Sequence, residues 1–117
     1  MNTANIKESE FACRCCGKVK IERELVMLLQ MVRTHFNRPL TITSGYRCPS
    51  HNANVGGVKN SQHAKGTAAD IVVSGIEPSE VYHFIDSLLP NSYGLGLYIN
   101  KGFVHVDVRA AKARWDG

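Results

Sequence analysis

The sequence predicts a small α+β domain in which an antiparallel sheet has helices packed on one of its sides. Two stretches carry apolar residues at helical spacing, and four short β-rich stretches lie between turns of glycine, asparagine and proline. Hydrophobic residues make up 44% of the 117 residues and charged residues 21%, which is ordinary for a globular chain. A chain of this length supports one core. We therefore expect a single domain over residues 1–117, with a cysteine-rich segment, 1–20, packed on it.

The first helix is expected over residues 22–36, where apolar residues form one stripe and the sequence Asn-Arg-Pro at 37–39 ends it. The stripe consists of Leu25, Leu28, Leu29, Val32 and Phe36. A short strand is expected at Leu40–Thr43, and it leads into the sequence Ser-Gly-Tyr-Arg at 44–47.

The middle of the chain predicts a second strand and a second helix. The strand is expected at Ala68–Val73. The helix begins at Pro78, a residue suited to the first turn, and ends before Pro90. Its apolar stripe consists of Val81, Phe84, Ile85 and Leu88.

A hairpin is expected near the end of the chain. A strand near Leu95–Ile99 is followed by a turn, Asn-Lys-Gly, at 100–102 and by a last strand at Phe103–Arg109. Valines alternate with polar residues in the last strand, so the valines belong to the core. His105 and Asp107 then lie side by side on the opposite face, as a metal site requires.

Two histidines and a carboxylate indicate a metal centre. His63 and Asp70 are separated by Gly66, which lets the backbone turn, and His105 lies on the predicted last strand. Three protein ligands with one open position are typical of a catalytic zinc site. The alternative is a surface histidine and a buried, hydrogen-bonded aspartate, and the spacing alone does not decide between them.

Three separated motifs carry a resemblance to a known family. They are Ser-Gly-Tyr-Arg at 44–47, Ser-x-His-x-x-Gly-x-Ala-x-Asp-Ile at 61–71 and Phe-Val-His-Val-Asp at 103–107. With these motifs the sequence resembles the zinc D-Ala-D-Ala carboxypeptidase family, within the lysostaphin, D-Ala-D-Ala peptidase and hedgehog-like group, and especially its short phage-type members. The resemblance implies a hedgehog/D-Ala-D-Ala-peptidase-like fold. It also implies that His63, Asp70 and His105 are the ligands of a Zn²⁺ ion.

The residue that would accept a proton from the attacking water is less clear. Several members of that family have an acidic residue three positions before the last histidine ligand, and this sequence has Gly102 there. Asp107 is the natural substitute as a catalytic general base, because it shares a strand face with His105. Asp107 could instead orient an imidazole by accepting its N–H, and the sequence leaves both roles open.

Arg47 is the other candidate catalytic residue. The resemblance implies that it points into the cleft, where a guanidinium can bind a substrate carboxylate or stabilise the oxyanion. The alternative is a surface arginine that pairs with a neighbour. Ser61 and Asn52 are further candidates for substrate binding.

Four cysteines, Cys13, Cys15, Cys16 and Cys48, allow three interpretations: disulfides, a second metal held partly by thiolates, or free buried thiols. The resemblance favours a structural role, in which residues 13–16 are tethered to Cys48. Basic residues around the cluster could suggest a nucleic-acid-binding zinc module. The lack of a second CxxC pair and of interleaved aromatic residues argues against that module, so no nucleic-acid partner is expected.

The resemblance implies an enzyme, a zinc metallopeptidase that hydrolyses peptidoglycan stem peptides. It would act as a D-Ala-D-Ala carboxypeptidase or a cross-link endopeptidase, in a phage endolysin or a prophage cell-wall hydrolase. The alternative is a non-catalytic, zinc-containing cell-wall-binding module of the same fold. Gly102 favours that module, whereas the intact ligand set, Arg47 and Asp107 favour the peptidase.

The start of the sequence lacks the apolar stretch of a secretory signal peptide, and no apolar run approaches the length of a membrane span. We therefore expect no membrane partner, and a protein made in the cytoplasm that acts on the wall after lysis or export by another route. We also expect a monomer. The net charge of +4 favours anionic partners but does not by itself indicate a function.

Overall fold

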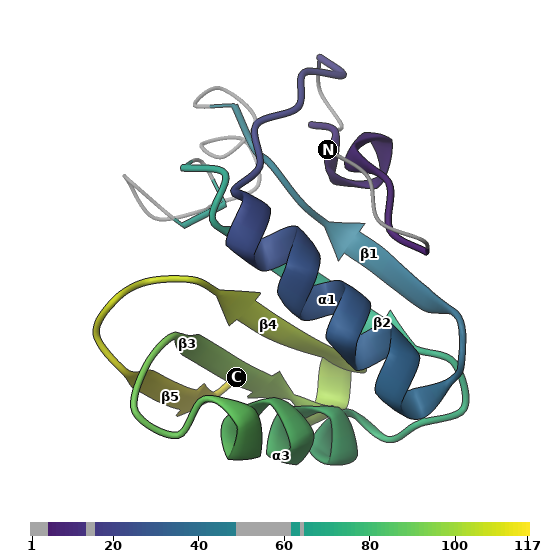
Figure 1. Ribbon diagram of the computed structural model, residues 1–117, viewed down its shortest axis with the longest axis vertical. Coiled ribbons are helices and arrows are strands. Elements are labelled where there is room, and N and C mark those ends of the chain that lie inside the picture. Colours follow the sequence, from purple (N-terminus) through teal and green to yellow (C-terminus); the bar gives the residue numbers. More distant parts are fainter. Residues whose placement is uncertain (1–4, 14–15, 49–61, 64) are drawn as a thin grey trace.

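The computed structural model describes residues 5–13, 16–48, 62–63 and 65–117, and it confirms the predicted α+β class (Figure 1). The strands are β1 (Leu40–Ser44), β2 (Ala68–Val73), β3 (Gly94–Tyr98), β4 (Phe103–Asp107) and β5 (Ala113–Asp116). The helices are α1 (Arg23–Phe36) and α3 (Pro78–Leu88), with the 3-10 turns η1 (Glu8–Phe11) and η2 (Ile99–Lys101).

The five strands form one mixed sheet in the order β1-β2-β4-β3-β5. The four strands predicted from the sequence pair antiparallel to one another. The sheet is not wholly antiparallel, however, because β5 was not predicted and pairs parallel to β3. The sequence did not indicate β5 because the contacts that hold this strand are made with distant parts of the chain. Among them are those of the Arg114 side chain. That guanidinium lies 2.7 Å from Asp86 Oδ1 on α3 and donates to the carbonyl oxygens of Leu89 and Tyr93 at 2.7 and 2.6 Å.

Both helices contact the sheet and one another, so they cover the same face (Figure 1). The core between helices and sheet includes Leu29 and Val32 of α1 and Ile85 of α3, all fully buried. Val104 and Val106 of β4 belong to the same cluster, as their alternation predicts. The opposite face of β4 carries His105 and Asp107.

The caps of the two long helices agree with the sequence. Asn37 adopts a left-handed conformation, with φ of 52°, and its N–H donates to Arg33 O at 3.0 Å. Pro78 occupies the first turn of α3, where the missing N–H costs no hydrogen bond.

The N-terminal segment packs against the segment that follows β1. Ile6 and Phe11 are fully buried in the core cluster. The N–H of Tyr46 donates to Phe11 O at 2.8 Å, and a Cβ at Gly45 would lie 2.6 Å from Phe11 Cα. Only glycine allows this approach of two backbones.

Replacing Phe11 by alanine is expected to lower the free energy of unfolding by about 3–5 kcal/mol, because it leaves a cavity between the N-terminal segment and the sheet. Denaturant unfolding measures the change. Val19→Ala in the same segment is the matched control, since Val19 is 41% exposed, and it should change stability by less than about 0.5 kcal/mol. Equal losses in the two variants would mean that residues 5–13 do not belong to the core.

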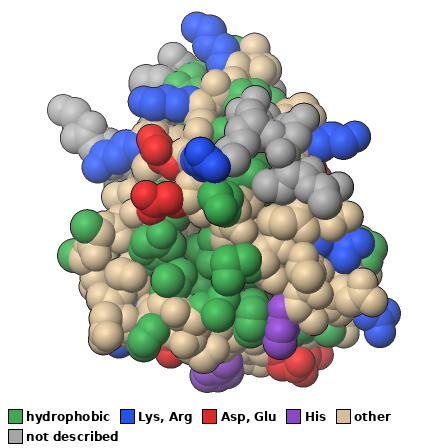
Figure 2. Space-filling view, viewed as in Figure 1, with side chains coloured by type: hydrophobic (Ala, Val, Ile, Leu, Met, Phe, Trp, Pro, Cys, Tyr) green, Lys and Arg blue, Asp and Glu red, His purple; other side chains and the backbone are tan. Residues whose placement is uncertain are grey.

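The outer surface of the helices carries apolar side chains, which gather in one patch of Figure 2. Met27 and Met31 of α1 and Leu88 of α3 are exposed by 48%, 52% and 37%. Among the described residues, no helix combines the length and apolarity needed to cross a membrane.

Candidate metal centre

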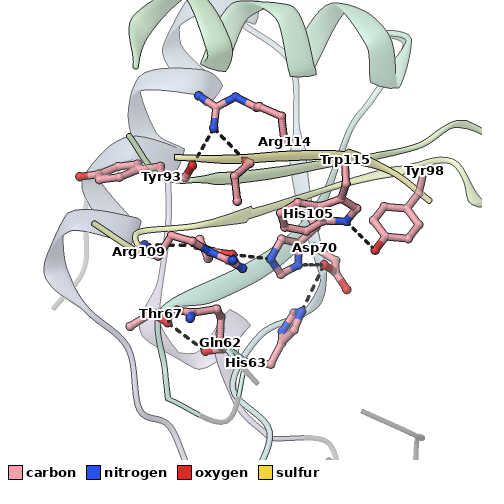
Figure 3. Close-up of polar contacts among 12 residues, drawn as sticks. Gln62, His63, Thr67, Asp70, Tyr93, Tyr98, His105, Arg109, Arg114 and Trp115 are labelled. Atoms are coloured by element: carbon pink, nitrogen blue, oxygen red, sulfur yellow. Dashed lines mark hydrogen bonds and ion pairs between the residues drawn. The ribbon is translucent and has the colours of Figure 1, made fainter. Parts of the chain in front are cut away.

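Three buried side chains converge on the face of the sheet that the helices leave uncovered. Asp70 of β2 and His105 of β4 are paired in register across two neighbouring strands, and His63 lies in the turn that precedes β2. Asp70 Oδ1 lies 3.3 Å from His63 Nε2 and 3.0 Å from His105 Nδ1 (Figure 3). The structure therefore brings together all three residues that the sequence suggested as metal ligands.

Each imidazole is held from behind by an acceptor. His63 Nδ1 lies 2.8 Å from Gly45 O, and His105 Nε2 lies 2.8 Å from Asp107 Oδ2. These contacts fit imidazoles that donate their outer N–H groups. With a metal ion bound, His63 Nε2 and His105 Nδ1 would offer it their lone pairs, whereas without one they hydrogen-bond to Asp70. Such outer acceptors fix the tautomer and the ring orientation of metal-binding histidines.

The donor set fits a first-row divalent ion. The three ligand atoms lie within 4.8 Å of one another and all three residues are buried. A tetrahedral ion with donors ~2.0–2.1 Å away would separate neighbouring donors by about 3.3 Å. The observed separations of 3.3 and 3.0 Å from Asp70 Oδ1 are close to that value.

The pKa values reflect the same contacts. Burial alone would raise the pKa of Asp70, but hydrogen bonds with His105 and His63 lower it to about 2. Burial alone would lower the pKa of His105, but its hydrogen bonds to Asp107 and Asp70 raise it instead. Asp70 is therefore a carboxylate, the form in which it can bind a cation.

Both carboxylate oxygens of Asp107 are already engaged. The side chain is fully buried. Oδ2 accepts from His105 Nε2 at 2.8 Å and from Arg109 Nη2 at 2.7 Å, and Oδ1 accepts from Arg109 Nε at 2.7 Å and from its backbone N–H at 3.2 Å. Burial would raise the pKa of Asp107, but these hydrogen bonds hold it well below its usual range. Asp107 lies behind the ring of His105, on the side away from Asp70.

Arg47 lies at the rim of the centre. Its Nη2 is 3.8 Å from Asp70 Oδ2, and its Nε donates to Ser44 Oγ at 3.3 Å. The backbone N–H of Arg47 donates to His63 O at 3.1 Å, which ties the segment after β1 to the turn that holds His63. Ser61, Asn52 and Cys15 lie outside the described residues.

One wall of the centre was missed by the sequence analysis. Trp115 of β5 lies with its ring 5.2 Å from the ring of His105, and its Nε1 donates to Tyr98 Oη at 3.0 Å (Figure 3). Gly96 is paired with His105, and a Cβ there would lie 2.4 Å from Trp115 Nε1. Gly94 is paired with Asp107 and leaves room for its carboxylate. Two glycines at alternate positions of one strand were the available signal for a close approach on this face.

Gly102 occupies a turn whose backbone favours glycine. It has φ of +79° at the end of η2, and its N–H donates to Tyr98 O at 2.8 Å. An acidic residue at this position would have to adopt a left-handed backbone conformation, which is unfavourable for residues with a Cβ. The turn geometry thus explains the glycine at the position where several members of the resembling family have an acidic residue.

The described cysteines form a second cluster of possible metal ligands. The sulfur atoms of Cys13, Cys16 and Cys48 lie within 4.8 Å of one another. The backbone N–H of Lys18 lowers the pKa of Cys16, but desolvation and the neighbouring Cys13 and Cys48 thiols together raise it above its ordinary value. The predicted proximity of residues 13–16 to Cys48 is therefore observed for Cys13 and Cys16.

The fold and the buried His-Asp-His centre together define a candidate metallopeptidase. The family model of peptidase M15 matches residues 4–107, and the chain belongs to this family. The resemblance inferred from the three motifs is thereby confirmed. Over 86 residues the chain is 34% identical to a probable peptidoglycan L,D-endopeptidase, MepK, of Haemophilus influenzae. The match covers 69% of this chain and 45% of the relative, so the chain spans less than half of that protein.

Proposed function

We propose that the protein is a zinc-dependent peptidase that hydrolyses peptidoglycan stem peptides. One observation carries the proposal: His63 Nε2, Asp70 Oδ1 and His105 Nδ1 converge at a buried point, with each imidazole held by an outer acceptor. Membership of the peptidase M15 family supports hydrolysis of a peptide bond. The name of the Haemophilus influenzae relative supports peptidoglycan as the substrate.

Each residue of the centre would have a distinct role in the reaction. His63, Asp70 and His105 would hold the ion, and one carboxylate beside two neutral imidazoles leaves the site with a net positive charge. A bound zinc ion would lower the pKa of water and polarise the scissile carbonyl. Arg47, at the rim, would bind a substrate carboxylate or the developing oxyanion through its guanidinium.

For Asp107, the contacts support the orienting role rather than the role of general base. A general base must reach the proton of the attacking water. The oxygens of Asp107 instead face His105 Nε2 and Arg109, behind the ligand ring. We therefore propose that Asp107 fixes His105 with Nε2 protonated and Nδ1 free for the metal.

The name of the relative favours cleavage of an L,D bond within the peptidoglycan peptide over removal of a terminal D-Ala. We further propose that the protein acts as a monomer on the cell wall after lysis or export, as a phage endolysin or a prophage hydrolase would.

Digestion of purified sacculi, with the released muropeptides identified by mass spectrometry, tests the function. Wild type with zinc should release products of one bond type, and a chelator should stop the release until zinc is added back. The double variant His63→Ala/His105→Ala should release nothing. If wild-type protein with zinc bound attaches to sacculi but releases no muropeptide, the protein is a binding module of the same fold.

Arg47→Ala is expected to lower kcat/KM for muropeptide release by about 10–100-fold, because a charge-assisted hydrogen bond contributes about 1.5–3 kcal/mol. Arg47→Lys should recover only part of the loss, since lysine keeps the charge but not the planar fork. Arg38→Ala removes an exposed charge at the end of α1 and controls for general attraction to an anionic wall. Equal losses for Arg38→Ala and Arg47→Ala would contradict a specific role for Arg47.

A further inference from the structure

A second cluster of metal-binding side chains lies outside the catalytic centre. Cys13 and Cys16 belong to the N-terminal segment, in the spacing Cys-x-x-Cys followed by Gly17, and Cys48 comes from the segment after β1. Their sulfur atoms lie within 4.8 Å of one another, although Cys13 and Cys48 are 35 positions apart in the chain. None of the three is joined to another by a disulfide.

The backbone folds around the sulfur of Cys13. The N–H of Cys48 donates to Cys13 Sγ at 3.4 Å, which links this sulfur to the segment after β1. Two backbone hydrogen bonds hold Cys13 close to the residues after Cys16: Cys13 N donates to Lys18 O at 2.7 Å and Gly17 N donates to Cys13 O at 2.8 Å. Gly17 has φ of +74° with no atom near its absent Cβ, so its backbone conformation is what favours glycine there.

Three sulfurs at these separations suit a metal better than a disulfide. A disulfide joins two sulfurs at about 2.05 Å and leaves the third unused. A tetrahedral zinc ion with Zn–S of about 2.3 Å spaces its sulfur ligands by about 3.8 Å, which the observed upper limit of 4.8 Å allows. Thiolates are soft ligands and select zinc over magnesium or calcium.

We propose that Cys13, Cys16 and Cys48 supply three of the ligands of a second zinc ion, distinct from the ion of the His63–Asp70–His105 centre. The proposal concerns these three thiols, since Cys15 and His51 lie outside the described residues. It does not depend on the protein being a peptidase.

Such an ion would fasten the N-terminal segment to the segment that supports the catalytic centre. Residues 45–48 supply Gly45 O, which lies 2.8 Å from His63 Nδ1, and they carry Arg47. The same segment already contacts the N-terminal segment through the hydrogen bond from Tyr46 N to Phe11 O at 2.8 Å. A metal crosslink next to this contact would hold the outer acceptor of His63 and the guanidinium of Arg47 in place.

Elemental analysis of wild type and four variants, purified in parallel under reducing conditions, tests the proposal. Wild type should contain about two zinc ions per chain and His63→Ala/His105→Ala about one. Cys48→Ser should contain about one, and the combined triple variant none. Val19→Ser places the same new residue at an exposed position of the N-terminal segment and should keep two.

A second measurement does not need the cysteine variants to fold. In the His63→Ala/His105→Ala protein, titrating the thiols with a mercurial reagent should release the remaining zinc, detected with a chromogenic chelator. Substituting cobalt into the same protein should give thiolate-to-metal charge-transfer absorption, which a site of nitrogen and oxygen ligands lacks. The proposal is overturned if the double variant holds no zinc. It is also overturned if the intact mass shows a disulfide within this cluster in freshly purified protein.

Discussion

Replacing Asp70 by asparagine is expected to remove the ion from the His63–Asp70–His105 centre and to lower peptidase activity by on the order of 10³-fold or more. The asparagine would keep the size of the side chain but lose the charge that balances the cation. The carboxylate oxygen that is lost lies between both histidines, at 3.3 Å from His63 Nε2 and 3.0 Å from His105 Nδ1. No other described residue joins these three in a group of possible metal ligands.

The measurements are zinc content and muropeptide release, made on the same preparation. Thr43→Val is the matched control, because Thr43 Oγ1 donates to the backbone oxygen of Asp70 at 3.2 Å and does not touch its carboxylate. The control should keep zinc and activity. Wild-type zinc content and turnover in Asp70→Asn would show that Asp70 is not a ligand and that the ion, if any, is held elsewhere.

Much of the fold was predictable because its signals are local. The strand expected at Ala68–Val73 has those bounds in the structure, and the helix expected over 22–36 is observed at Arg23–Phe36. In the helix, the spacing of apolar residues reports directly which side is buried. In the strand, which is buried on both faces, the signal is a short apolar run that includes β-branched residues. Strand β5 was missed because Ala-Arg-Trp-Asp, although it alternates apolar and polar residues, is only four residues long and is a weak signal by itself. β5 is held by its pairing with β3 and by the contacts of Arg114 with Asp86 and with the carbonyl oxygen of Leu89 after α3, and no local pattern contains that information.

The candidate ligands of the centre could be predicted from the sequence, but the strand register and the outer acceptors that position them could not. The spacing of His63, Asp70 and His105 suggested a metal site, whereas the register that pairs Asp70 with His105 depends on the strand order β1-β2-β4-β3-β5. The outer acceptor of His63 is the backbone oxygen of Gly45. Because every residue has a backbone carbonyl, the sequence does not indicate which one accepts this hydrogen bond. Asp107 was suggested by strand alternation, but its contacts with His105 and Arg109, which support the proposed orienting role, depend on the tertiary structure.

Replacing Asp107 by asparagine is expected to lower zinc affinity by roughly 10–100-fold, with activity falling at limiting zinc. The reason is the tautomer of His105. Asp107 accepts the N–H of His105 Nε2 at 2.8 Å, which would leave the lone pair of Nδ1 for the metal ion. An asparagine that keeps its oxygen on Arg109 presents its NH₂ to Nε2. The imidazole then protonates at Nδ1 and turns a donor, rather than a lone pair, toward the ion.

Varying the zinc concentration separates this role from general-base catalysis. If Asp107 orients His105, saturating zinc should restore most of the turnover of Asp107→Asn. If Asp107 were the general base, the variant would bind zinc normally and stay ~10²–10⁴-fold slower at every zinc concentration.

Arg109→Ala is a useful second variant, because it removes the two side-chain donors to Asp107 and leaves the contact with His105. Asp107 is fully buried whereas the side chain of Arg109 is 33% exposed, so the loss of Arg109 leaves a buried carboxylate with His105 as its remaining side-chain partner. Arg109→Ala should therefore lower stability while zinc affinity stays closer to wild type than in Asp107→Asn. Wild-type affinity and turnover in Asp107→Asn would exclude both roles, since either one requires the carboxylate.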